Sequence, residues 1–259
     1  MPFATVDDAR VHYRIDGQAD GPILVLSHSL GADLTVWDAQ AAALTGAFRV
    51  LRYDARGHGA SSVTPGPYTV ERLARDALGV LDALAIPRTH FCGLSLGGMV
   101  GLWLGAHAAE RLGKLVLANT AARIGTPEFW KARIDAVQRG SLAAVAPAVL
   151  DRWLTAGFRE QQTEAVAAVR RALLATAADG YIAGCAAVRD ADLRDAARAV
   201  AVPTLVIAGA RDAVTPPADS RWVADAIPGA RYCELAAVHL SNVEATEQFT
   251  AAVSDFLTQ

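Results

Sequence analysis

The stretch FCGLSLGGMVGLWLG, from Phe91 to Gly105, sets one serine among five glycines where an apolar strand passes into an apolar helix. Glycine costs a helix roughly 0.5 to 1 kcal/mol relative to alanine, so this many glycines indicate another structural demand. Within the stretch, Gly93 to Gly97 match G-x-S-x-G, in which a sharp strand-to-helix turn raises the serine hydroxyl above a sheet. The pattern predicts Ser95 as a nucleophile, and its alternative is an ordinary glycine-rich packing turn.

Nucleotide-binding motifs are missing from the same residues. The sequence has no G-K-[ST] for a phosphate-cradling loop and no G-x-G-x-x-G after an early strand. We therefore expect no nucleotide cofactor, and we predict no metal site.

A serine hydroxyl is a weak nucleophile until a base takes its proton, so a histidine is required. Of six histidines, only His107 and His239 follow Ser95 in the chain. His107 lies down the helix that Ser95 opens, about 18 Å away at 1.5 Å per residue, and cannot reach the hydroxyl. His239 is the predicted base, with a surface histidine as the alternative. Ser241 and Glu244 form a capping-box pattern that is expected to hold its loop.

The third member should be an acid at the carboxyl end of a strand, in the chain order serine, acid, histidine. Asp212 follows the strand-like run TLVIAG directly, whereas Asn119, at the end of KLVLAN, carries no charge. Asp212 is therefore the predicted acid, and a turn-capping role is its alternative. The other aspartates between the serine and the histidine fall on a helix or in a charge cluster: Asp190, Asp192, Asp195, Asp219 and Asp225.

Backbone N–H groups are needed to hold the oxyanion of an acyl transfer. The residue after the nucleophile, Leu96, is one expected donor, and Leu30, which follows the early strand in ILVLSHSLGAD, is the other. Another strand end, YDARGHGASS, offers Asp54, Arg56 and His58. For these three we favour structural pairing over catalysis.

Eight short apolar runs bounded by turn residues predict the strands of an α/β domain. The first two alternate like an antiparallel hairpin, whereas ILVLSH, HFCGL, KLVLAN and TLVIAG read as parallel strands buried on both faces. Helical patterns between them predict a mostly parallel eight-stranded twisted sheet flanked by helices. The runs are FATV, VHYRI, ILVLSH, RVLRYD, HFCGL, KLVLAN, TLVIAG and RYCEL.

One long segment breaks this alternation. Residues 122–190 contain alanine-rich helical stretches and no convincing strand, which predicts a helical cap inserted into a core formed by 1–121 and 191–259. Extra packing helices are the alternative interpretation.

Bulk composition excludes several classes of protein. The chain has 259 residues, of which 53% are hydrophobic and 20% charged, a net charge of -3 and no basic run, so neither nucleic acid nor an anionic membrane is an expected partner. The first residues do not resemble a signal peptide, and no run is long enough to span a membrane. Three widely spaced cysteines indicate reduced thiols and a cytoplasmic location.

The sequence resembles the α/β-hydrolase superfamily over essentially its full length, and within it the 3-oxoadipate enol-lactonases of the β-ketoadipate pathway. The resemblance rests on CGLSLGGMVG, LANTAARIGTPEFW, VLRYDARGHGASS and HLSNVE, of which NTAARIG followed by a tryptophan is the most specific. Ser29 in HSLG differs from the glycine of many relatives. The resemblance implies a cofactor-independent hydrolysis of a small anionic enol lactone by Ser95, His239 and Asp212, with Leu30 and Leu96 at the oxyanion.

The carboxylate of such a substrate needs a cation, and arginine suits it because its planar fork binds both oxygens. Arg133 lies three residues after Trp130 and so shares its helix face, which makes this pair the predicted substrate-binding residues. A surface arginine is the alternative. The other candidate arginines of the cap are interpreted as solvated helix charges: Arg123, Arg152, Arg170 and Arg171.

Rival functions use the same fold. A carboxylesterase or a carbon-carbon bond hydrolase would employ the same triad, and a ligand-binding protein on a hydrolase fold would keep it with little turnover. Epoxide hydrolases and haloalkane dehalogenases are disfavoured because they resemble this fold but carry an aspartate where Ser95 stands.

Overall fold

The computed structural model describes residues 2–259 and contains one eight-stranded sheet, confirming the predicted fold. The strand order is β1-β2-β4-β3-β5-β6-β7-β8. Pairing is antiparallel between β1 and β2 and between β2 and β4, and parallel from β4 to β8. The strands are β1 (Phe3–Val6), β2 (Ala9–Asp16), β3 (Ile23–Ser27), β4 (Arg49–Tyr53), β5 (Thr89–Leu94), β6 (Leu112–Ala118), β7 (Thr204–Gly209) and β8 (Arg231–Leu235).

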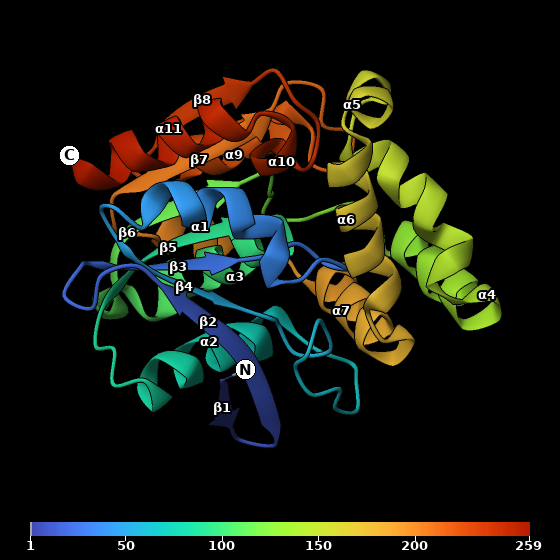
Figure 1. The fold of residues 1–259 in the computed structure, drawn as a ribbon, viewed down its shortest axis with the longest axis horizontal. Helices are drawn as coiled ribbons and strands as arrows, with labels where there is room; N and C mark the ends of the chain where they lie inside the picture. The colour runs from blue at the N-terminus through green and yellow to red at the C-terminus, as the bar shows by residue number, and fades with distance from the viewer. Residues whose placement is uncertain (1) are drawn as a thin grey trace.

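Each predicted apolar run is a strand, and the inner strands are covered on both faces of the sheet, whereas β1 and β8 at its two edges are partly exposed. Every residue of β7 is buried, and the first two strands form the expected hairpin. Helices α1 (Asp38–Leu44) and α11 (Thr246–Thr258) pack together on one face, in front of the sheet in Figure 1. The other face is covered by a row of contacting helices: α2 (Val70–Ala83), α3 (Leu96–His107), α8 (Arg194–Ala199) and α9 (Pro217–Ala226).

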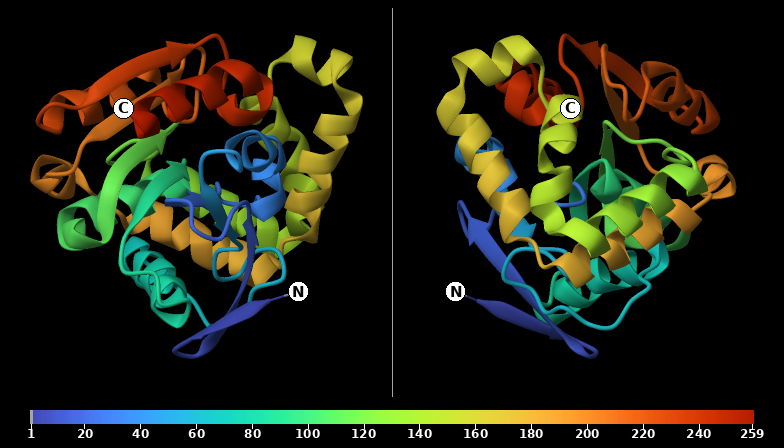
Figure 2. Two further views of the ribbon diagram at one scale, coloured as in Figure 1. Left: turned by 60° about the vertical axis from the view of Figure 1, so that its left-hand side comes forward. Right: turned by 90° about the vertical axis from the view of Figure 1, so that its right-hand side faces the viewer.

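Between β6 and β7 the chain forms a group of helices that lies to one side of the sheet (Figures 1 and 2). Within residues 122–190 the structure has only helices and connecting loops, as the sequence indicates; that they form a separable cap with those bounds stays a prediction. We call this group the cap: α4 (Pro127–Trp153), α5 (Ala156–Gln161), α6 (Thr163–Ala175) and α7 (Ala178–Asp190).

A bend at Ser141 divides α4 into two helical arms. The backbone angles of Ser141 are φ 63° and ψ 178°, far from helical values, while the residues on both sides continue as helix. The two arms therefore run in different directions, so that residues far apart along α4 can face the same space.

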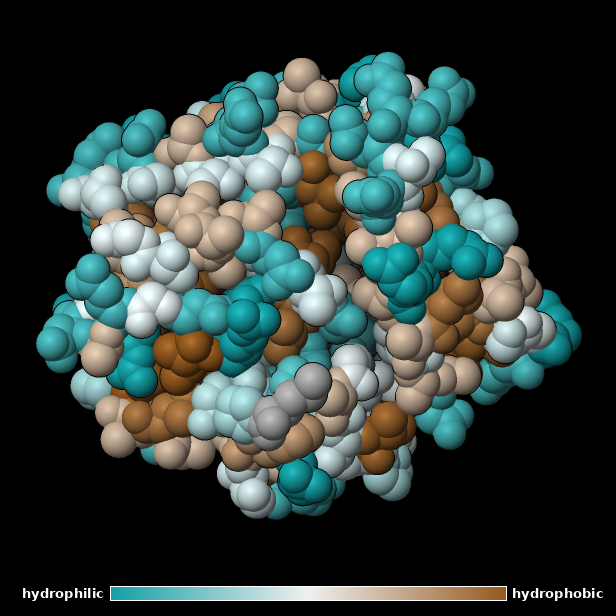
Figure 3. All heavy atoms as spheres, in the orientation of Figure 1, coloured by the Kyte–Doolittle hydropathy of each residue, from teal (hydrophilic) through white to brown (hydrophobic). Residues whose placement is uncertain are grey.

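An apolar groove marks the seam between the cap and the sheet domain. Val36, Val169 and Val243 line it, and hydrophobic side chains are visible in the hollow between α6 and the short helix α10 (Ser241–Glu244) in Figure 3. The remaining short helices are η1 (Leu34–Trp37) and η2 (Ala109–Arg111). No helix within residues 2–259 combines the length and apolarity that a membrane span requires.

Candidate active site

Ser95 occupies the turn between β5 and α3, with φ 56° and ψ -112°. The turn is possible because two glycines let the backbone cross closely. A Cβ atom on Gly97 would lie 2.2 Å from the carbonyl oxygen of Ser27, and one on Gly93 would lie 2.1 Å from the carbonyl oxygen of Gly97. The strand-to-helix turn therefore requires Gly93 and Gly97, whereas Gly98 and Gly101 make room for the side chains of Thr120 and Leu117, which a Cβ would approach to 2.6 and 2.9 Å.

Three side chains from distant parts of the chain meet at this turn. The Nε2 atom of His239 lies 2.9 Å from Ser95 Oγ, and its Nδ1 atom lies 2.8 Å from Asp212 Oδ2. When Nδ1–H donates to the carboxylate, Nε2 is left with a lone pair that can accept the serine proton. The exposed fractions are 6% for Ser95, 1% for His239 and 3% for Asp212, so this proton path is shielded from bulk water.

Asp212 is held in its charged form by several donors. Its Oδ1 accepts from the backbone N–H groups of Val214 and Thr215, at 2.7 and 3.1 Å, and its Oδ2 accepts from the Thr215 hydroxyl at 2.7 Å. Burial raises the pKa of Asp212, but the charge of His239 and the hydrogen bonds from His239 and Thr215 outweigh it and lower the pKa to about 2. The carboxylate is thus ionised and fixed in position at neutral pH.

Asn119, which the sequence offered only as an uncharged rival to the acid, supports the acid instead. Its Nδ2 donates to Asp212 Oδ2 at 3.1 Å and to the Val238 carbonyl at 2.9 Å, and its Oδ1 accepts from Ser241 Oγ at 2.5 Å. It links the acid to the loop that carries the histidine. A polar residue at the carboxyl end of β6 was the signal that could have identified it.

The loop of His239 is tied down on both sides of the histidine. The N–H of Val238 donates to Glu244 Oε2 at 2.9 Å, and the N–H of Leu240 donates to the carbonyl of Trp153, at the end of α4, at 3.0 Å. Glu244 Oε1 also accepts from the backbone N–H and the hydroxyl of Thr155, just before α5. The histidine loop is therefore bound directly to the cap.

The predicted capping box is wrong. Leu240, not Ser241, is the N-cap of α10 and makes no side-chain cap, and the Ser241 hydroxyl donates to Asn119. The buried Asn119 Oδ1 accepts a hydrogen bond from the Ser241 hydroxyl, which is therefore not available to cap the helix. Glu244 nevertheless holds the loop, through Val238 rather than through the residue at the helix start.

Ser95 and His239 open on a pocket between the sheet and the cap. Leu30 lines it beside Ser29, and Leu96 is the first residue of α3, where an α-helix leaves N–H groups without intrahelical acceptors. Their roles as oxyanion donors stay predictions. The cap side of the pocket is formed by Ile124, Phe129, Trp130, Arg133, Val149, Arg152, Trp153, Tyr181 and Val188.

Trp130 and Arg133 both reach this pocket. The Trp130 Nε1 donates to the carbonyl of Ile124 at 2.6 Å, which fixes the ring, and Arg133 is half-buried with Nη1 3.2 Å from the Tyr181 hydroxyl. The Arg133 guanidinium also lies 5.2 Å from the centre of the Phe129 ring. The structure brings the predicted pair to the serine, although their binding of substrate is untested.

Arg152 is a correction to the sequence interpretation. It is exposed, as expected of a solvated charge, yet it lines the same pocket and lies 4.8 Å from the centre of the Phe129 ring. Helical periodicity could not reveal this, because the bend at Ser141 changes which residues of α4 face each other.

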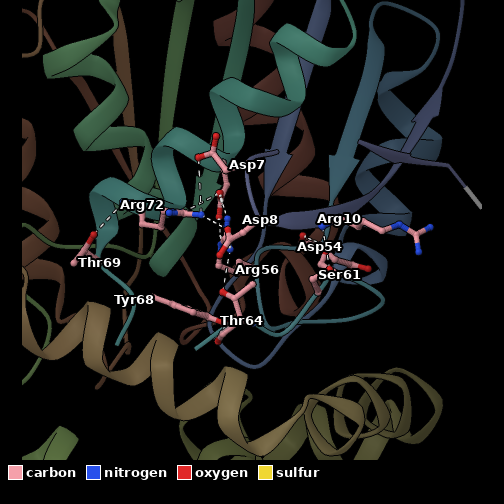
Figure 4. A network of polar contacts seen from close by, with 12 residues as sticks. Asp7, Asp8, Arg10, Asp54, Arg56, Ser61, Thr64, Tyr68, Thr69 and Arg72 are labelled. Atoms are coloured by element: carbon pink, nitrogen blue, oxygen red, sulfur yellow. Dashed lines mark hydrogen bonds and ion pairs between the residues drawn. The ribbon is translucent and has the colours of Figure 1, made fainter. Parts of the chain in front are cut away.

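The polar cluster of the YDARGHGASS turn lies elsewhere and has its own partners (Figure 4). Arg56 forms ion pairs with Asp8 and Asp76 at 2.7 and 2.6 Å. Burial, followed by the nearby His28, lowers the pKa of His58 to about 3, so this ring is neutral. The cluster joins the β1–β2 hairpin to α2, in agreement with the structural pairing expected for it.

The sequence model of the α/β hydrolase fold family matches residues 22–245 of this chain. The chain therefore belongs to that family. The chain is 41% identical to 3-oxoadipate enol-lactonase 2 of Acinetobacter baylyi, over 96% of this chain and 93% of that protein. It is similar in structure to the enol-lactonase from Burkholderia xenovorans LB400, with 48% identity, full coverage of both chains and a TM-score of 0.98. A malate-bound thermophilic esterase from Thermogutta terrifontis is also similar in structure, with 28% identity, coverage of 99% of this chain and 97% of that chain, and a TM-score of 0.92. The prediction of a hydrolase of this fold is confirmed.

Proposed function

We propose that the chain hydrolyses 3-oxoadipate enol-lactone to 3-oxoadipate, a step in aromatic degradation by the β-ketoadipate pathway. The observation that carries this proposal is the 2.9 Å contact between Ser95 Oγ and His239 Nε2, at a pocket that Arg133 lines from the cap. Two similar proteins named as enol-lactonases support the choice of substrate.

The first half of the reaction opens the ring. His239 Nε2 accepts the hydroxyl proton while Ser95 Oγ attacks the lactone carbonyl, and the N–H groups of Leu30 and Leu96 stabilise the oxyanion. Collapse of the tetrahedral intermediate breaks the bond to the ring oxygen. The leaving enolate takes the proton from His239, and the resulting enol tautomerises to the ketone.

The second half releases the acyl group. A water molecule gives its proton to His239 and attacks the ester carbonyl, and the returning proton restores Ser95. Asp212 stabilises the imidazolium in both halves, which its low pKa allows because it stays ionised throughout.

Recognition of the acetate arm falls to Arg133 and Trp130. A carboxylate that enters a partly dry pocket needs a charged partner, because an unpaired buried charge is costly. Arg133 has no carboxylate partner within residues 2–259, and its guanidinium is therefore free to pair with the substrate.

The alternative within the enzymes is a carboxylesterase, and the thermophilic esterase among the similar structures favours it over a carbon-carbon bond hydrolase. The alternative outside the enzymes is a ligand-binding protein on the same fold. The relative rates of hydrolysis of the enol lactone and of a simple aryl ester distinguish a lactonase from a carboxylesterase. Sustained turnover distinguishes either enzyme from a ligand-binding protein.

The decisive assay generates the enol lactone in place from muconolactone with its isomerase and follows the loss of lactone absorbance. We expect turnover well above the uncatalysed rate with the purified chain and none with the Ser95→Ala variant. A wild-type rate equal to the uncatalysed rate overturns the proposal.

The cellular setting is proposed from composition alone. A net charge of -3 favours neither nucleic acid nor an anionic membrane as a partner, and the reduced thiols expected of the sequence fit the cytoplasm. The proposed partner is thus the small anionic substrate.

A further inference from the structure

The mouth of the Ser95 pocket holds two guanidinium groups, although they come from opposite arms of α4. Arg133 and Arg152 are 19 residues apart, a separation of about 28 Å along a straight helix at 1.5 Å per residue. In the structure their guanidinium carbons lie 5.2 and 4.8 Å from the centre of the same Phe129 ring. The bend at Ser141 is what brings the two charges together.

Within residues 2–259, neither guanidinium forms an ion pair with a carboxylate. Two cations of the cap outside the pocket lining are paired: Lys131 with Asp135 at 2.9 Å, and Arg159 with Asp151. Asp151 is the neighbour of Arg152 in sequence, yet its carboxylate is bound to Arg159.

Two like charges on one ring repel each other, and the Phe129 ring alone offsets this only partly, since a cation–π contact contributes about 0.5 to 2 kcal/mol. An anion in the pocket that both residues line would offset this repulsion and could accept charge-assisted hydrogen bonds from them. Both guanidinium groups are therefore available to an anionic ligand in the pocket.

We propose that Arg133, Phe129 and Arg152 form a two-cation binding site for the carboxylate of an anionic substrate. Arg152, which is exposed, captures the anion at the mouth, and Arg133, which is half-buried, retains it beside Ser95. This inference rests on the proposed function, because it assumes that the ester hydrolysed at Ser95 carries a carboxylate.

The capture step makes a kinetic prediction. A charge at the rim of a site acts mainly on the association rate and its salt dependence. At low ionic strength, Arg152→Gln should lower kcat/KM for the enol lactone about tenfold and leave kcat within about twofold. At about 1 M salt, where the Debye length is about 3 Å, the two proteins should converge.

Two control variants separate this role from a general effect of charge. Arg170→Gln removes the same charge from an exposed position on α6 outside the pocket lining, and it should match the wild type. Arg152→Lys keeps the charge but loses the planar fork, and it should recover most of the lost kcat/KM.

Binding without turnover keeps the test independent of the proposed reaction. In the inactive Ser95→Ala background, calorimetry with adipate as the anionic probe should show about tenfold weaker binding for Arg152→Gln and no change for Arg170→Gln. If Arg152→Gln and Arg170→Gln behave alike in both kinetics and adipate binding, the two-cation site is overturned. If adipate binding depends on Arg152 while no lactone is hydrolysed, the proposed function fails and the anion site stands.

Discussion

Two aspartates of this chain hold a histidine in nearly the same way at two different strand ends. Asp212, after β7, lies 2.8 Å from His239 Nδ1, and Asp54, after β4, lies 2.7 Å from His12 Nδ1. Both carboxylates are buried, at 3% and 2% exposed. An Asp–His pair is therefore not by itself a mark of catalysis in this fold.

The difference lies in what else each pair contacts. His239 presents its second nitrogen to Ser95 at 2.9 Å, at the pocket, whereas the His12 ring lies against Phe3 at the edge strand, 5.3 Å between centres. Asp54 also accepts from the backbone N–H groups of Leu34 and Ala60, at 2.8 and 2.9 Å. One pair is arranged to move a proton, and the other holds the turn after β4 to the hairpin.

Removing the nucleophile is the strongest test of this contrast. Ser95→Ala should abolish turnover and leave the fold intact, because the alanine fits where a small side chain already sits. In a serine protease with the same kind of triad, loss of the serine costs on the order of a million-fold in kcat. Steady-state kinetics on purified protein, with circular dichroism to check folding, measure it; activity within about tenfold of wild type would exclude Ser95 as the nucleophile.

Exchanging the two aspartates for asparagine should separate their roles. Asp212→Asn should lose about ten-thousand-fold in kcat, since an amide favours the wrong histidine tautomer and cannot stabilise the imidazolium. Asp54→Asn should keep kcat within a few-fold but lower the free energy of unfolding by about 1 to 3 kcal/mol, because one oxygen becomes an amide facing donors. Kinetics and urea unfolding of both variants make the comparison.

The opposite ranking of the two variants would move the catalytic acid to Asp54 and contradict the chain order serine, acid, histidine. A large loss of activity in both would mean that the turn after β4 also supports the site. Only the first result changes the assignment of the acid.

The preference for Asp212 over Asp54 was accessible from the sequence because it depends on chain order, whereas the pairing of Asp54 with His12 was not predicted. Asp212 was chosen over Asp54 because it lies between Ser95 and His239, and the eight apolar runs predicted the strands because sheet burial leaves a direct compositional trace. Local composition therefore predicted the strands, and motif and chain order predicted the three proposed catalytic residues that the structure brings together.

The support of the site was accessible only in part: the sequence indicated that Glu244 holds the histidine loop, but its partners, and those of Asn119, depend on tertiary contacts. Asn119 and Glu244 act through partners far along the chain, and the Ser241 hydroxyl takes one of these instead of capping its own helix. Arg152 reaches the pocket only because α4 bends at Ser141, which no periodicity within either arm predicts.

Recognition on the cap should be separable from chemistry on the sheet. Arg133→Ala should reduce kcat/KM for the enol lactone by about 1.5 to 3 kcal/mol, the range of a hydrogen bond to a charged group, and barely affect a neutral aryl ester. Parallel kinetics with the two substrates measure the difference. Equal losses on both would indicate damage to the cap, and the carboxylate would then need another partner.

Acid should weaken the Asp212 pair in a defined pH window. The pKa of Asp212 is lowered from 3.8 to about 2, so its stabilising effect is complete above pH 3.8 and is lost as the pH falls toward 2. By linkage the loss is on the order of 2 kcal/mol. The difference in unfolding free energy between the wild type and Asp212→Asn should shrink by this amount between pH 5 and pH 2. A constant difference would contradict the lowered pKa.

The smallest expected effect concerns the Glu244 carboxylate, which links the loop of His239 to the cap. One oxygen accepts from the N–H of Val238, next to His239, and the other accepts from Thr155 at the cap. Glutamine has a single acceptor oxygen, so Glu244→Gln must leave one of these donors facing an amide NH2. We expect about a fivefold to tenfold lower kcat, equivalent to one hydrogen bond of about 1 kcal/mol, with KM unchanged because Glu244 does not line the pocket. Thr155→Ala, which loses only the hydroxyl on the cap side, should have a smaller effect on kcat. A rise in KM with kcat preserved would show that Glu244 acts through the shape of the cap instead of through the position of His239.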